Sequence, residues 1–127
     1  MSNKKIIHSP SAPEPIGPYS QAILAGDTLY VSGQICIDSQ TGRLTNEDVA
    51  NETHQVMKNL ENILHEAGFA FKDVVKCTIF LKNMDDFSTV NSIYGQYFTH
   101  THPARETVQV SRLPKDVSVE ISCIAVK

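Results

Sequence analysis

With 127 residues, of which 41% are hydrophobic and 20% charged, the chain has the size and composition of one globular domain spanning residues 1–127. Its formal net charge of -3 provides no broad positive field, so nucleic acid is not an expected partner. No apolar run approaches the ~20 residues that span a bilayer and no signal-peptide core follows the N-terminus, so we expect a cytoplasmic protein without membrane contact.

The first third of the chain predicts two short strands after a proline-rich segment. Residues 9–18 hold four prolines and are expected to be extended, ending in a turn. Strands are expected at 22–25 and 28–32, with the reversal at Gly26-Asp27. Gly33 should end the second strand or form a bulge in it.

A long amphipathic helix is predicted next. Residues 46–67 carry apolar side chains at helical spacing, with Thr45 or Asn46 as the N-terminal cap and Gly68 at the C-terminal end. The apolar run at 74–81 then predicts a strand.

A second helix and two strands complete the predicted fold. The helix covers 85–98, and its Gly95 indicates a close approach of another segment. Strands follow at 107–111 and 117–126, joined by a tight connection at 113–116. The order β-β-α-β-α-β-β favours an α+β domain with a mostly antiparallel sheet.

The last predicted strand has two unlike faces. One face is apolar throughout, which suits packing under the two helices, whereas the other is polar at first and ends in Ile124 and Val126. Two helices can cover only one face of a sheet. We therefore expect a second copy of the chain to cover the other face.

Two charged residues are candidates for chemistry. Arg105 just precedes a predicted strand, and Glu120 lies within the last one. They could form a structural ion pair or be exposed, or they could share a cleft in which arginine binds a carboxylate and glutamate moves a proton. Tyr19 and Ser32-Gly33 are equally open: each could be structural or could line such a pocket.

Metal and thiol chemistry are not expected. The cysteines, Cys36, Cys77 and Cys123, are odd in number and widely spaced, which favours buried, reduced thiols. The five histidines show no metal-ligand spacing. We expect no cofactor.

At several segments the chain resembles the Rid (reactive intermediate deaminase, YjgF-type) family, and within it the RidA enamine/imine deaminase subgroup. These segments span nearly the whole chain in the family's order, and together they are highly specific. They are APEPIGPYSQA (12–22), LYVSGQI (29–35), VKCTIFL (75–81), FSTVNSIY (87–94), PAR (103–105) and RLPKDVSVEISCIA (112–125).

The resemblance implies a chorismate-mutase-like α+β domain with two helices on one face of its sheet. It also implies a homotrimer in which the sheets form a central barrel and the clefts lie between subunits. By match to the family pattern, Arg105 would bind the substrate carboxylate and Glu120 would activate the attacking water. The other substrate-binding positions would be Tyr19, Ser32, Gly33, Asn91 and the backbone of Thr107.

One position departs from the family pattern. Many bacterial members carry cysteine where this chain has Thr107, so we expect no thiol chemistry there. Glu106 adds a negative charge beside Arg105, and strand alternation predicts that it points away from it.

The activity implied by the resemblance is hydrolysis of 2-aminoacrylate-type enamines and imines to 2-keto acids and ammonia, with small 2-imino or 2-keto acids as ligands. Two alternatives stay open. One is a small-acid-binding or chaperone-like protein without turnover, against which Glu120 argues. The other is an endoribonuclease, against which the net charge of -3 argues.

Overall fold

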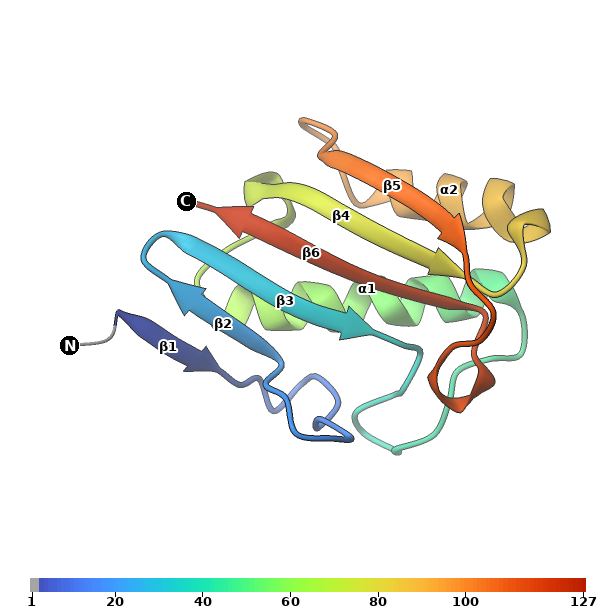
Figure 1. Cartoon of the computed structure of the whole chain (residues 1–127), viewed down its shortest axis with the longest axis horizontal. Helices are drawn as coiled ribbons and strands as arrows, with labels where there is room; N and C mark the ends of the chain where they lie inside the picture. The colour runs from blue at the N-terminus through green and yellow to red at the C-terminus, as the bar shows by residue number, and fades with distance from the viewer. Residues whose placement is uncertain (1–2) are drawn as a thin grey trace.

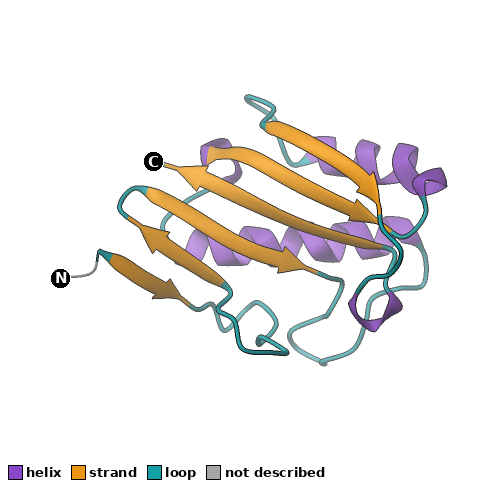
Figure 2. Ribbon diagram, in the orientation of Figure 1, coloured by secondary structure: helices purple, strands orange, loops and turns teal. Residues whose placement is uncertain are grey.

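The computed structural model describes residues 3–127, which form a six-stranded sheet in the order β1-β2-β3-β6-β4-β5 with two α-helices against one face (Figures 1 and 2). The strands are β1 (Lys4–Ile7), β2 (Ala22–Ala25), β3 (Thr28–Gln34), β4 (Val74–Leu81), β5 (Ala104–Gln109) and β6 (Val119–Val126). The helices are α1 (Val49–Glu66) and α2 (Phe87–Gln96), with short 3-10 helices η1 (Phe71–Asp73), η2 (Met84–Asp86) and η3 (Pro114–Asp116). Neighbouring strands are antiparallel except for β4 and β5. The expected α+β class is confirmed.

The N-terminal strand β1 was not predicted from the sequence. It has four residues, of which only Ile7 is buried, and Lys4-Lys5 gives no apolar alternation. Its pairing with β2 depends on backbone hydrogen bonds that a sequence pattern does not reveal.

Strand β5 begins earlier than predicted and pairs differently. It starts at Ala104, so Arg105 lies inside the strand rather than before it. Its parallel partner is β4, with α2 as the crossover between them, whereas β6 lies between β3 and β4. The connection at 113–116 is therefore not a hairpin: it carries the chain from the edge of the sheet to its centre.

Both helices begin later than predicted. The cap of α1 is Asp48, whose side chain accepts a hydrogen bond from the Asn51 backbone N–H at 2.7 Å, so the expected cap at Thr45 or Asn46 was wrong. Gly68 has a φ of 81°, as a helix-ending glycine requires. The close approach expected at Gly95 was also wrong, because an added Cβ there would meet nothing within 4 Å.

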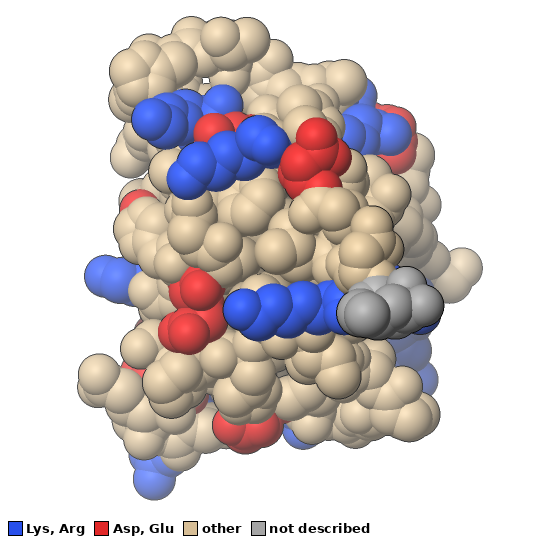
Figure 3. All heavy atoms as spheres, turned by 90° about the vertical axis from the view of Figure 1, so that its left-hand side faces the viewer, with Lys and Arg blue, Asp and Glu red and all other residues tan. Residues whose placement is uncertain are grey.

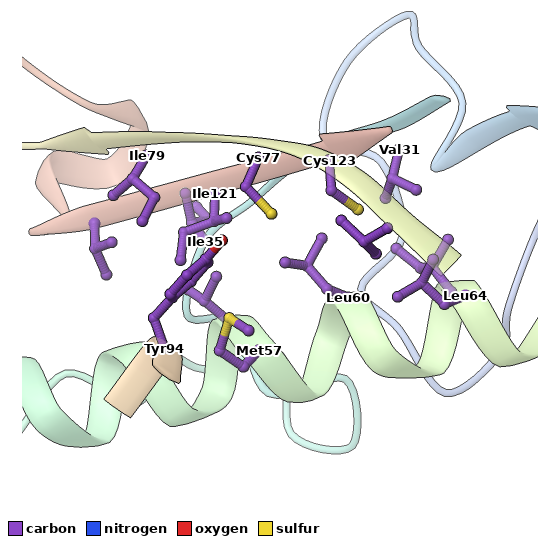
Figure 4. Packing of buried hydrophobic residues seen from close by; sticks show 14 of the residues in the cluster. Val31, Ile35, Met57, Leu60, Leu64, Cys77, Ile79, Tyr94, Ile121 and Cys123 are labelled. Carbon is purple, nitrogen blue, oxygen red and sulfur yellow. The ribbon is translucent and has the colours of Figure 1, made fainter. Parts of the chain in front are cut away.

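The core lies between the sheet and α1. In Figure 4, Cys77 and Cys123 point from the sheet toward Leu60 and Leu64 on α1. All three cysteines are free and buried, as expected. Replacing one of the fully buried leucines by alanine costs about 2–5 kcal/mol in proteins generally.

The sheet face opposite the helices carries exposed apolar side chains. Ile6 is 67% exposed, Tyr30 51% and Val108 42%. Strand register places Ile6 and Tyr30 on the same face, because Ile6 pairs with Ile23 and Ile23 with Tyr30. Val108 pairs with Phe80, and Phe80 with Glu120 on β6. Among the described residues, no helix is long and apolar enough to cross a membrane.

Candidate active site

Arg105 is held by aromatic side chains at the edge of the molecule. Its Cζ lies 5.0 Å from the ring centroid of Tyr94 and 5.7 Å from that of Phe87, both on α2. Such contacts attract a guanidinium to the ring face and fix its position. Within residues 3–127 Arg105 forms no ion pair, so its charge is available to an external anion.

Two polar residues share the faces on which Arg105 and its aromatic neighbours lie. Asn91 lies four residues after Phe87 and three before Tyr94, and therefore shares the helix face that looks toward Arg105. Thr107 is two positions along β5, on the same face of the strand. In the described part of the chain the buried hydroxyls of Tyr94 and Thr107 form no hydrogen bond. We call Phe87, Asn91, Tyr94, Arg105 and Thr107 the arginine cluster.

Glu106 does not compete for Arg105. Its carboxylate lies 3.2 Å from Lys76 Nζ and accepts a hydrogen bond from Thr78 Oγ1 at 3.0 Å, on the opposite face of the sheet. These hydrogen bonds lower the pKa of Glu106. The outward orientation predicted for this side chain is confirmed.

Glu120 lies in a separate hollow of about 300 Å³ on the sheet face opposite the helices. The hollow is lined by Ile16, Tyr19, Ser32, Gly33, Pro114 and Glu120. Burial raises the pKa of the Glu120 carboxyl, because the charged form is disfavoured away from water. A carboxyl with a raised pKa suits proton transfer near neutral pH. We call Tyr19, Ser32, Gly33 and Glu120 the glutamate pocket.

Gly33 is required by the position of Glu120. The strand register shifts between Val31 and Gln34, so of the two alternatives predicted at Gly33, a strand end or a bulge, the structure has the bulge. A Cβ added at Gly33 would lie 2.8 Å from Glu120 Cδ and 3.0 Å from its Cγ. The Glu120 carboxylate therefore occupies the space that a side chain at position 33 would fill.

The hydroxyls of the glutamate pocket are fixed by the backbone. Ser32 Oγ donates to the Ser20 carbonyl at 2.6 Å, which leaves its lone pairs to accept. Tyr19 Oη accepts from the Ile16 N–H at 3.2 Å, which leaves its proton to donate. The sequence did not single out Ile16 or Pro114. The sequence feature that could have indicated these two residues is the proline and glycine content of the turns that contain them.

One chain does not bring the arginine cluster and the glutamate pocket together. Glu120 pairs with Phe80, and Phe80 with Val108 on β5, three residues beyond Arg105. The two Cα atoms are thus about 10 Å apart along the strands and about 10 Å across them. Arg105 pairs with Cys77, which points toward the helices, so the two side chains also lie on opposite faces. An Arg105–Glu120 ion pair within the chain is excluded.

Another cavity lies away from these residues, between the ends of α1 and α2. It has a volume of about 220 Å³, an aromatic floor of Phe71, Tyr97 and Phe98, and a rim that mixes Glu61 with Lys72 and two histidines. This mixture of charges selects no ligand class. Among residues 3–127, no three potential metal-ligating side chains lie together. Acidic and basic side chains are also interspersed on the face shown in Figure 3.

Known proteins resemble this chain over nearly its whole length. Residues 9–127 match the family described as Endoribonuclease L-PSP. A RutC family protein of Pyrococcus horikoshii is 50% identical over 124 residues, covering 98% of each chain. The human protein named 2-iminobutanoate/2-iminopropanoate deaminase is 46% identical over 124 residues, covering 98% of this chain and 90% of that one. The crystal structure of E. coli TdcF with bound serine has a TM-score of 0.93 at 41% identity, covering 97% and 98%.

Proposed function

Because the chain belongs to the Rid/YjgF/RutC (L-PSP) family, we propose that it hydrolyses small 2-imino acids to 2-keto acids and ammonia. The observation that carries the proposal is Arg105, a guanidinium fixed between two rings and without an acidic partner among residues 3–127. Such a group binds a carboxylate through two parallel hydrogen bonds. The name of the human relative and the serine bound to TdcF support a small amino- or imino-acid ligand.

The active cleft is proposed to form between two chains. A small acid cannot reach both Arg105 and Glu120 of one chain, because they lie on opposite faces of the sheet. A homotrimer whose open sheet faces form a central barrel would cover the exposed Ile6, Tyr30 and Val108. The arginine cluster of one chain would then face the glutamate pocket of the next.

The chemistry needs only these two groups and water. Arg105 binds the carboxylate and orients the imine carbon, C2, toward a water molecule at Glu120 of the adjacent chain. Glu120 takes one proton as the water oxygen bonds to C2, and the C=N electron pair moves to nitrogen. Glu120 then returns this proton to the nitrogen, which gives a carbinolamine. It next takes the hydroxyl proton of that carbinolamine and passes it to the amine nitrogen, so that the C=O bond forms as the C–N bond breaks and ammonia leaves.

Turnover is tested with an imine generated in situ by a threonine dehydratase. Purified protein should accelerate the appearance of 2-oxobutanoate above the uncatalysed rate. The same preparation is incubated with RNA at matched concentration. Binding of 2-oxobutanoate without acceleration would favour the binding-protein alternative, and RNA cleavage alone would favour the endoribonuclease.

Assembly is tested separately by light scattering at micromolar concentration. The proposal requires a particle with three times the mass of the 14.1 kDa chain. A monomeric mass would contradict it, since a single chain cannot complete the cleft.

A further inference from the structure

A buried carboxylate outside the proposed cleft connects the two segments that meet at Glu120. Glu52, in the first turn of α1, is 3% exposed. Its Oε1 accepts a hydrogen bond from the Ser118 backbone N–H at 2.9 Å and lies 3.6 Å from the Cys36 thiol. Burying a carboxylate costs free energy unless the group is hydrogen-bonded, so the bonds that Glu52 accepts indicate a structural role for it.

These two partners flank the glutamate pocket. Ser118 is two residues before Glu120 and Cys36 is three residues after Gly33, so each lies about 7–10 Å along the chain from the pocket. The Ser118 carbonyl also accepts from the Lys82 N–H at 2.9 Å, so both of its backbone groups are bonded. The start of β6 is thus fixed at Ser118.

We propose that Glu52 is a positioning residue for Glu120: its buried oxygen fixes the start of β6 relative to the end of β3, and so holds the Glu120 carboxylate in the space left by Gly33. The expected effect on turnover rests on the proposed deaminase function. The positioning of β6 itself rests only on the hydrogen bonds of Glu52.

The role requires an acceptor oxygen rather than a negative charge. Both partners of Glu52 are donors: one is the Ser118 backbone N–H and the other is the Cys36 thiol. Burial, together with the nearby Glu52 carboxylate, raises the pKa of that thiol to about 12 and keeps it protonated. An amide oxygen can accept the same two hydrogen bonds. Glu52→Gln should therefore preserve the connection, whereas Glu52→Met, of similar size, should remove it.

Asn59 provides a matched control on the same helix. It is 1% exposed, and its Nδ2 donates to the carbonyls of Ile35 and Ile37 at 3.1 and 3.0 Å. It therefore holds the segment after β3 without touching the start of β6. Asn59→Ala should lower the melting temperature and leave the turnover rate unchanged.

The experiment measures kcat, KM and melting temperature for Glu52→Met, Glu52→Ala, Glu52→Gln and Asn59→Ala. We expect kcat to fall on the order of ten-fold in the Met and Ala variants, because a small displacement of a reacting group is costly. KM should stay near the wild-type value, since the arginine cluster is untouched. Glu52→Gln should retain most of the activity. Loss of kcat in Asn59→Ala at an equal loss of stability, or in Glu52→Gln, would overturn the proposal.

A second measurement does not depend on turnover. The 13C carboxyl resonance of Glu120, assigned by its absence in Glu120→Gln, should shift in Glu52→Met and not in Asn59→Ala. An unshifted resonance in Glu52→Met would overturn the positioning role even if the protein is a deaminase. A shifted resonance in a protein that lacks deaminase activity would support the positioning role and reject the proposed function.

Discussion

The arginine cluster and the glutamate pocket hold their charged groups by opposite means. The position of Arg105 is set by large neighbouring side chains, since two aromatic rings on α2 contact its guanidinium. The position of Glu120 is set by the absence of a side chain, since its carboxylate fills the space beside Gly33 at the bulge in β3. The first arrangement suits a permanent charge that anchors a ligand. The second, where burial raises the pKa, suits a group that exchanges a proton.

The largest expected effect tests whether the two regions act across chains. Arg105→Ala should lower deaminase activity by about 100-fold and Glu120→Gln by about 10²–10⁴-fold. When the two variants are co-expressed and mix randomly in a ring, about one quarter of the clefts receive an intact residue from each chain. The mixture should therefore show about one quarter of the wild-type activity, measured as 2-oxobutanoate formation.

A double variant is the control for this experiment. Chains carrying both substitutions, mixed with the Arg105→Ala variant, can form no complete cleft and should stay inactive. Absence of recovery in the first mixture, with mixed oligomers demonstrated by mass spectrometry, would show that the two residues do not share a cleft.

The next effect concerns the geometry of the arginine cluster. Arg105→Lys keeps the charge but loses the two-point grip, and should lower kcat/KM by about 10–100-fold, nearly as much as Arg105→Ala. Near wild-type activity in Arg105→Lys would reject the carboxylate-binding role. In that case Arg105→Ala should lower the melting temperature instead of the activity.

A smaller effect is expected from filling the space at Gly33. The Cβ of Gly33→Ala would push the flexible end of Glu120 aside, so activity should fall by roughly ten-fold while the melting temperature changes little. Gly95→Ala is the control: it meets nothing within 4 Å and should add about 1 kcal/mol of stability without changing activity. Equal activities in the two variants would contradict the role given to Gly33.

The smallest effect is on stability. The folded-state pKa of Glu120 is raised, so its ionised form destabilises the fold at neutral pH, and this cost disappears below the unfolded pKa of about 4.3. Glu120→Gln should raise the free energy of unfolding at pH 7, and the gain should vanish as the pH falls below about 4. Denaturant titrations at the two pH values measure it, and a loss of stability at pH 7 would reject the pKa shift.

The sequence predicted the α+β class, the helices and the bulge because periodicity and glycine placement are local signals. It did not predict β1, or that β6 lies between β3 and β4, because pairing between distant segments leaves no such pattern. Arg105, Glu120 and Tyr19 were singled out from the sequence pattern itself, with the structural reading left open. The resemblance gave them roles and added Asn91 and Thr107. The separation of Arg105 from Glu120 required strand register to be known. Glu52 was overlooked, although it lies on the buried stripe of α1 three residues after Val49.

The order of the strands leaves β1 and β5 as the two outer edges of the sheet. Outer edges expose backbone donors and acceptors that can recruit strands from other molecules and begin aggregation. Here those edges carry charge, with Lys4 and Lys5 on β1 and Arg105 and Glu106 on β5. On β1 the two lysines would repel the same edge of a second molecule, which discourages edge-to-edge pairing through this strand.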